Sequence, residues 1–158
     1  MLYFLLKYVH IIGAAVLLGT GAGIAFFMLI AHRTGNTATI AGVASIVVLA
    51  DFLFTATAAV LQPITGVALA LHAGYELTEG WIMLSIALYL FIGAFWLPVV
   101  RMQMKMRDLA RASLEDNRAL PDEYHRLFRT WFIFGFPAFG AMLVVYWLML
   151  TRPIIGIF

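Results

Sequence analysis

Four long apolar segments constrain this chain more than any other feature of its sequence. A helix needs about 20 mostly apolar residues to cross a bilayer, and segments of at least that length lie at about 2–30, 39–71, 78–101 and 131–150. Hydrophobic residues make up 64% of the chain and charged residues 11%, whereas soluble domains average about 45–50% and about 25%. A core built from 158 residues cannot hide that much apolar surface, so lipid must cover the excess.

We therefore predict an all-α polytopic membrane protein, a four-transmembrane-helix antiparallel bundle that forms a single domain over residues 1–158. The apolar run at the N-terminus continues well past the length of a cleaved signal peptide, so we interpret it as an uncleaved first span. The second span is expected to be interrupted at Gln62-Pro63, because proline removes a helical hydrogen bond.

A helical hairpin outside the lipid is predicted at about 102–130, between the third and fourth spans. The sequence still suits a helix beyond Arg101 but becomes basic. The segment Pro121-Asp122-Glu123 is typical of a new helix start, where proline fits the first turn and acids favour its positive end.

The lysines and arginines are unevenly distributed between the two ends of the predicted bundle. Short loops rich in these residues face the cytoplasm. We therefore expect the first and third loops to be cytoplasmic and both termini to face outward. The net charge of +2 is too small to suggest a nucleic-acid partner, and the lipid bilayer is the expected one. The first and third loops hold eight of the ten basic residues, Arg33, Arg101, Lys105, Arg107, Arg111, Arg118, Arg126 and Arg129, and the other side holds Lys7 and Arg152.

Several common chemistries are absent from the sequence. There is no cysteine, which excludes disulfides, thiolate metal sites and a cysteine nucleophile. No two histidines lie four residues apart, and no Gly-rich phosphate loop or GxSxG elbow occurs. The sequence therefore assigns no catalytic residue and leaves open whether the protein is an enzyme.

His10 lies inside the first span, about two turns from its outer end. An intramembrane histidine normally faces the bundle interior and has a partner there. Gly13, Ala14 and Gly21 lie near it and leave room for something flat, and a neutral imidazole can bind haem iron. The competing interpretation is a histidine that hydrogen-bonds a neighbouring helix or reaches the interface.

A polar stripe runs along the second span. Asp51, Thr55, Ala58, Gln62 and Thr65 follow one another at spacings of four, three, four and three, which places them on one helical face. An aspartate near the bilayer centre is costly unless it is protonated or paired. We expect the stripe to face the bundle interior, either as a binding surface or as a polar contact between helices.

A depth count brings His10 and the polar stripe together. If the first two spans are antiparallel, His10 lies near the level of residue 60, and Gln62 is close to its height. Pro63 cannot donate to Ala59, so the Ala59 carbonyl should be free. Tyr89 on the third span could donate to a ligand or to Asp51, or satisfy a polar group inside the bundle.

The first span also carries a small-residue stripe. Gly19 and Gly23 form a GxxxG pair roughly opposite His10. Such pairs let helices approach closely. We expect this face to pack within the bundle or against a second copy of the chain.

Several distinctive motifs are spread along the chain: Leu6-Lys7-Tyr8-Val9-His10-Ile11, Leu61-Gln62-Pro63-Ile64-Thr65-Gly66, Leu77-Thr78-Glu79-Gly80-Trp81, Trp96-Leu97-Pro98-Val99-Val100, and Tyr124-His125-Arg126-Leu127-Phe128 with Trp131 and Phe132. Together they resemble a family of bacterial integral membrane proteins catalogued as domain of unknown function 2269 (DUF2269). The resemblance covers nearly the whole chain and implies a four-helix protein of the bacterial inner membrane, without an established activity. The outward termini would then be periplasmic.

The start of the first span is also similar to the start of HemJ-type protoporphyrinogen oxidases and, more loosely, of CopD-type copper proteins. In the HemJ type, a histidine near the start of the first helix is associated with haem b, and this role would fall on His10. The similarity covers one helix. The oxidase's other functional positions have no match here, because Leu77 and not a base follows His72 by five residues.

Two hypotheses about function follow. In the first, the outer half of the bundle holds a haem-like cofactor, with His10 as the iron ligand and Gln62 and Tyr89 nearby. In the second, the protein is a non-catalytic membrane module. It would be a small-solute or proton carrier that depends on Asp51, or an assembly partner that packs through Gly19 against a second copy or another membrane protein.

Overall fold

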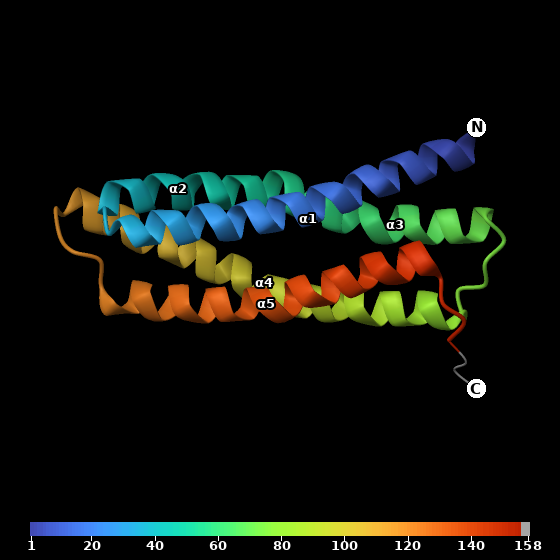
Figure 1. The fold of residues 1–158 in the computed structure, drawn as a ribbon. Coiled ribbons are helices and arrows are strands. Elements are labelled where there is room, and N and C mark those ends of the chain that lie inside the picture. Colours follow the sequence, from blue (N-terminus) through green and yellow to red (C-terminus); the bar gives the residue numbers. More distant parts are fainter. Residues whose placement is uncertain (156–158) are drawn as a thin grey trace.

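The computed structural model describes residues 1–155, which form long helices joined by short turns (Figure 1). The helices are α1 (Leu2–Thr34), α2 (Thr37–Ala50), the π-helix η1 (Asp51–Ala56), α3 (Thr57–His72), α4 (Gly80–Glu115) and α5 (Asp122–Thr151). The predicted single domain extends to residue 158, and residues 156–158 lie outside the described part.

Four helical stretches of the described chain are long and apolar enough to cross a membrane. They are α1, the continuous stretch Thr37–His72 that joins α2, η1 and α3, then α4 and α5. Consecutive stretches run in opposite directions, and the N-terminus lies at the same end of the bundle as the end of α5 (Figure 1). The prediction of an all-α, four-helix membrane bundle is confirmed.

The helices pack as two pairs that meet mainly at one end. α1 lies beside α2 and then α3, while α4 lies beside α5, and α2 packs against α4 (Figure 1). The most tightly packed side chains gather in the half of the bundle farther from the N-terminus. Met28, Ile40, Met106, Ala110 and Tyr124 there are 1% exposed or less. This half has a closely packed, mainly apolar core.

Large apolar side chains on every span point away from the bundle. Phe27 on α1 is 59% exposed, Ile46 on α2 67%, Leu90 on α4 66% and Phe136 on α5 65%. An apolar surface of this extent is unfavourable in water and is explained by lipid contact.

The second span departs from its prediction. The expected interruption at Gln62-Pro63 is wrong, because α3 continues through Pro63 to His72. The irregularity lies about three turns earlier, where η1 begins at Asp51. A π-helix closes its hydrogen bonds over five residues and not four, so this segment is locally wider than the α-helix around it.

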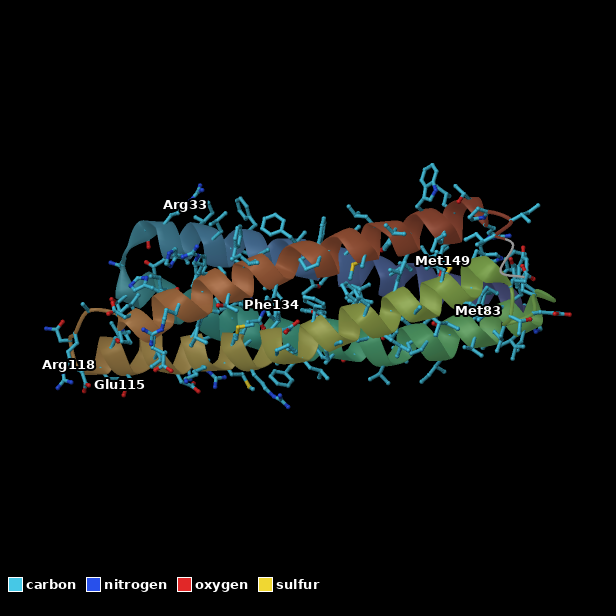
Figure 2. The ribbon with its side chains drawn as sticks, turned by 90° about the horizontal axis from the view of Figure 1, so that it is seen from below. Arg33, Met83, Glu115, Arg118, Phe134 and Met149 are labelled. Atoms are coloured by element: carbon cyan, nitrogen blue, oxygen red, sulfur yellow. The ribbon has the colours of Figure 1, made fainter. Side chains whose placement is uncertain are left out.

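The two helices that flank the third loop are longer than the predicted third and fourth spans. α4 continues to Glu115, and α5 begins at Asp122 directly after Pro121. Arg33, Glu115 and Arg118 lie together at one end of the bundle, here called the charged end, whereas Met83 and Met149 lie toward the other (Figure 2).

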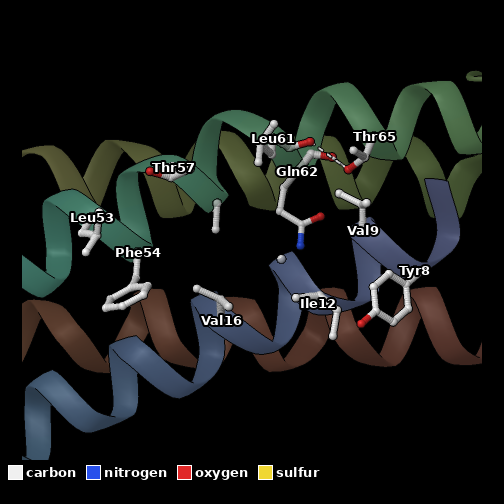
Figure 3. Close-up of a pocket in the computed structure, with 12 residues that line it drawn as sticks. Tyr8, Val9, Ile12, Val16, Leu53, Phe54, Thr57, Leu61, Gln62 and Thr65 are labelled. Carbon is white, nitrogen blue, oxygen red and sulfur yellow. Dashed lines mark hydrogen bonds between the residues drawn. The ribbon is translucent and has the colours of Figure 1, made fainter. Parts of the chain in front are cut away.

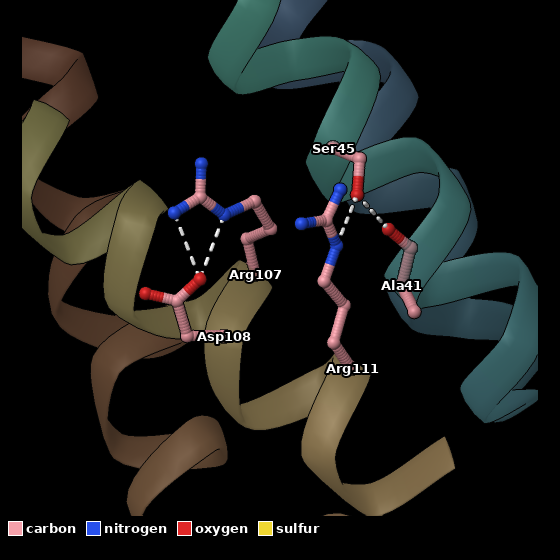
Figure 4. A network of polar contacts seen from close by, with 5 residues as sticks. All are labelled: Ala41, Ser45, Arg107, Asp108 and Arg111. Carbon is pink, nitrogen blue, oxygen red and sulfur yellow. Dashed lines mark hydrogen bonds and ion pairs between the residues drawn. The ribbon is translucent and has the colours of Figure 1, made fainter. Parts of the chain in front are cut away.

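Polar contacts join α4 to α2 near the charged end. Arg111 Nε donates to Ser45 Oγ at 3.1 Å, and Ser45 Oγ donates to the Ala41 carbonyl at 2.7 Å (Figure 4). Arg107 forms an ion pair with Asp108 at 2.8 Å. Exposed pairs of this kind contribute roughly 0–1 kcal/mol each, so packing of the apolar core dominates at this end.

Candidate functional site

The polar stripe of the second span faces the bundle interior. Asp51 is 3% exposed, Thr55 9%, Ala58 5%, and Gln62 and Thr65 7% each. These burials agree with the helical periodicity on which the prediction was based. The stripe runs from the middle of the bundle at Asp51 toward the end that holds His10, here called the His10 end.

Asp51 is held by neutral hydrogen-bond donors from α4. The Trp96 indole donates through Nε1 to Asp51 Oδ1 at 3.3 Å. The Gln103 amide, oriented by its hydrogen bonds, donates through Nε2 to Asp51 Oδ2 at 2.9 Å. No lysine, arginine or histidine within residues 1–155 forms an ion pair with this carboxyl group.

The same Gln103 amide extends the network to α5. Its Oε1 accepts from Trp131 Nε1 at 3.2 Å. With the amide reversed, its oxygen would face only acceptors and its nitrogen only donors. Gln103 and Trp131 are both 4% exposed, so the network connects η1, α4 and α5 away from lipid.

Sequence reasoning missed Gln103 and the role of Trp131. Gln103 lies in a basic stretch that was interpreted as a solvated helix end. Met106 and Ala110, three and seven residues after Gln103, gave a signal, because they place the glutamine on an apolar helical face where a buried amide needs a partner.

At the His10 end, the imidazole of His10 contacts α3. Its Nδ1 lies 2.9 Å from Thr65 Oγ1, and Thr65 Oγ1 donates to the Leu61 carbonyl at 2.8 Å. Since the threonine proton is used for that carbonyl, His10 Nδ1 is the donor and Nε2 carries the lone pair. The ring therefore points toward a neighbouring helix, as expected of an intramembrane histidine.

Gln62 lies at the level of His10, which the depth count predicted. Its Nε2 donates to the His10 carbonyl at 3.0 Å. Two glycines permit this close approach of α1 and α3. A Cβ atom on Gly13 would lie 3.2 Å from Gln62 Nε2, and one on Gly66 would lie 3.0 Å from His10 Cε1. The room that Gly13 leaves is filled by the Gln62 side chain.

Tyr89 satisfies the backbone group that Pro63 leaves free. Its hydroxyl donates to the Ala59 carbonyl, which has no helical donor because proline lacks an N–H. Of the roles considered for Tyr89, the structure shows the one inside the bundle. The hydroxyl contacts neither Asp51 nor the His10 side chain.

A groove of about 260 Å³ lies between α1 and the η1–α3 stretch (Figure 3). Its walls are mostly apolar, with Val9 and Val16 on α1 facing Leu53 and Leu61. The Gln62 amide reaches across it toward α1 (Figure 3). His10 is not among the residues that line it.

The small-residue stripe of α1 has no partner inside the described chain. A Cβ atom on Gly19 would meet nothing within 4 Å, and one on Gly23 would meet only Phe27 of the same helix. Packing of this face within the bundle, one of the two roles predicted for it, is therefore wrong for residues 1–155.

No cluster of three or more histidine, cysteine, aspartate or glutamate side chains that could hold a metal ion occurs in the part of the chain that the structure describes. Two oxygens on the stripe, Thr55 Oγ1 and Gln62 Oε1, are buried without a hydrogen-bond partner there. Along the second span, these two residues lie between Asp51 and Thr65, the residue that contacts His10.

The family comparison agrees with the architecture. Residues 4–153 match a family whose description is "Predicted integral membrane protein (DUF2269)". No curated protein and no solved structure matches the chain.

Proposed function

Because the chain belongs to the DUF2269 family of predicted integral membrane proteins, whose description names no activity, we propose a function from its own residues: a non-catalytic membrane module that binds and releases a proton at Asp51, as a proton-coupled carrier does. Asp51 is the proton-binding group, and the polar stripe toward His10 is its route of access.

The environment of the Asp51 carboxyl group carries this proposal. A carboxylate at the centre of a bilayer costs about 2.5–3.5 kcal/mol even on insertion scales. Within residues 1–155, the partners of Asp51 are neutral donors and include no cation. Two N–H donors support the charged form, while burial favours the neutral form. These opposing effects make reversible protonation possible at this position.

The surroundings of Asp51 differ between its two sides. Toward the His10 end lie the buried polar side chains Thr55, Gln62 and Thr65, two of them with unpartnered oxygens at which water could bind. Toward the charged end the core around Met28 and Met106 is mainly apolar and closely packed, with Tyr124 OH and His32 Nδ1 as its buried polar atoms without a partner in the described residues. Protons should therefore reach Asp51 from the His10 end, and release to the other side would need the apolar core to open.

Proton uptake into liposomes tests the proposal. Purified protein is reconstituted with a trapped pH-sensitive dye, and a potassium diffusion potential drives protons inward. We expect uptake by the wild type and its loss in Asp51→Asn. Asp108→Asn is the matched control, because Asp108 is an exposed carboxylate at the charged end. Equal uptake by wild type and Asp51→Asn, or none by either, would contradict the proposal.

Haem ligation by His10 is the second candidate. The hydrogen bond from His10 Nδ1 to Thr65 supports it, since a metal-bound histidine commonly donates its other ring N–H to a fixed acceptor. The other residues fit a haem poorly. Gln62 is held by the His10 backbone and Tyr89 by Ala59, and the groove nearby is not lined by His10. We derive no chemistry through this group.

The absorption spectrum of protein purified from haem-replete cells separates the two candidates. A Soret band that is lost in His10→Ala would favour haem. Our proposal expects a colourless, stable protein, and it expects Asp51→Asn to change proton uptake and leave the spectrum unchanged.

A further inference from the structure

The Gln103 amide lies between a group that can bind a proton and an indole on another helix. It donates to Asp51 from one end and accepts from Trp131 at the other. An amide has one donor end, the NH₂ group, and one acceptor end, the oxygen. The orientation of the Gln103 amide therefore decides whether Asp51 or Trp131 faces the NH₂ group. This arrangement makes the two contacts interdependent.

We propose that Gln103 couples the protonation of Asp51 to the hydrogen bond of Trp131, so that proton binding on η1 releases the indole on α5. The inference rests on the proposed function, since it needs Asp51 to take up a proton. It goes beyond that function in naming the residues that would carry the signal to another helix.

The coupling follows from the donors and acceptors in each state. With Asp51 ionised, Gln103 Nε2 donates to the carboxylate, and Oε1 accepts from Trp131. When a proton binds Asp51 Oδ2, the new O–H needs an acceptor. Rotation of the amide by half a turn presents Gln103 Oε1 to it. Nε2 then faces the Trp131 N–H, and because two donors cannot pair, that hydrogen bond is lost.

Because these side chains are buried, loss of the Trp131 hydrogen bond is costly and favours movement of the indole. Asp51, Gln103 and Trp131 are 3–4% exposed, so solvent cannot replace the lost partner. A buried donor without an acceptor costs about 1–3 kcal/mol. The Trp131 side chain must therefore move to find another acceptor, and Trp131 lies in the apolar core that closes the charged end.

Among the described residues 1–155, no other ionisable group lies where it could compete for the Asp51 proton. The groups facing Asp51 are Thr55 on its own stretch and Trp96 and Gln103 on α4, with Trp131 behind Gln103. Packed against η1, α1 carries no ionisable side chain between His10 and His32, and Arg101 on α4 is exposed. Thr55 is the one alternative acceptor for the new O–H, and its use would leave the amide in place.

Nuclear magnetic resonance of the full chain in lipid nanodiscs tests the proposal. The chain has four tryptophans, so ¹⁵N-indole labelling gives four N–H signals that single Trp→Phe variants assign. Selective ¹³C labelling of aspartate follows the Asp51 carboxyl group, which Asp51→Asn assigns. Both probes are followed across the pH range in which the protein stays folded.

We expect the Trp131 indole proton to shift upfield, as on loss of a hydrogen bond, with the same midpoint as the Asp51 carboxyl signal. In Gln103→Met, which keeps the side-chain length and removes the amide, the Trp131 signal should lose this pH dependence while Asp51 still titrates. In Asp51→Asn the Trp131 signal should be independent of pH. Trp147 lies 64% exposed on α5, and its signal is the internal control.

The two probes separate failure of the inference from failure of the proposed function. If the Asp51 signal titrates and the Trp131 signal stays fixed, Gln103 does not couple them, and proton binding stands by itself. If the Trp131 signal shifts equally in Gln103→Met, the coupling follows another route and the inference is overturned. If the Asp51 signal never titrates, the proposed function fails and the inference fails with it.

Discussion

The Ala59 carbonyl illustrates how single residues shape this bundle. Pro63 removes its helical donor, and Tyr89 on α4 supplies another. An unpartnered carbonyl inside a membrane protein is unfavourable because no water replaces the missing donor. The contact therefore links α3 to α4 in the half of the bundle that has no dense apolar core.

Tyr89→Phe should destabilise the protein by about 1–3 kcal/mol, the cost of leaving a buried carbonyl unsatisfied. Unfolding in mixed micelles measures the change. Tyr8→Phe is the control, because Tyr8 is 66% exposed and makes no hydrogen bond within the described residues. Equal stability of Tyr89→Phe and Tyr8→Phe would show that the hydrogen bond from Tyr89 to Ala59 does not stabilise the protein.

At the residue scale, the sequence predicted the depth of a side chain along its helix better than the direction in which that side chain faces. A rise of about 1.5 Å per residue was enough to bring His10 beside Gln62. It could not find Gln103, because rotation of α4 about its own axis decides whether that side chain faces Asp51. Helix rotation is set by packing, which the sequence of one helix does not contain.

At the element scale, η1 is the feature that sequence reasoning could not reach. Its residues Asp51–Ala56 include no proline or glycine that would mark an irregular turn. Pro63 was the visible signal, yet α3 passes through it because Tyr89 replaces the missing donor. π-Helical turns occur frequently at functional sites, and this one begins at the proposed proton-binding residue.

Two single-residue deletions test the geometry of the second span. A π-helical turn holds one residue more than an α-helical turn, so deleting Leu53 should regularise η1 and keep Gln62 and Thr65 facing α1. Deleting Val60 should rotate α3 by about 100° relative to Asp51. We expect thermal denaturation to show a near-normal transition for the first variant and a lost or strongly lowered one for the second. The reverse order would contradict the assignment of η1.

Gly19→Leu tests the open face of α1. Because nothing lies within 4 Å of a Cβ atom there, the variant should fold with unchanged stability. A measurable loss of monomer stability would mean that another part of the chain packs on Gly19. Cross-linking in membranes shows separately whether a second copy or another membrane protein uses this face, which small residues suit.

At the scale of the whole molecule, length and hydropathy were sufficient to predict the number of spans. The bilayer requires spans of this kind, because every backbone polar group inside the lipid must be hydrogen-bonded within a helix. The dense apolar core at the charged end could not be predicted. It depends on which faces meet, and the four helices meet unequally along their length.

Orientation remains a prediction, and its test is direct because the chain has no cysteine. Single substitutions Arg118→Cys and Tyr75→Cys place a thiol at opposite ends of the bundle. In intact bacterial cells, a membrane-impermeant maleimide should label the second and leave the first unlabelled until the cells are lysed. Labelling of Arg118→Cys in intact cells would reverse the topology inferred from the basic loops.

Infrared difference spectroscopy of the reconstituted protein tests the central claim most directly, because the C=O stretch of a protonated carboxyl group can be followed as pH changes. Our account predicts a buried carboxyl band that appears and disappears reversibly, is absent in Asp51→Asn and is retained in Asp108→Asn. A spectrum without such a band at any pH, or a band that survives in Asp51→Asn, would show that Asp51 does not bind and release a proton.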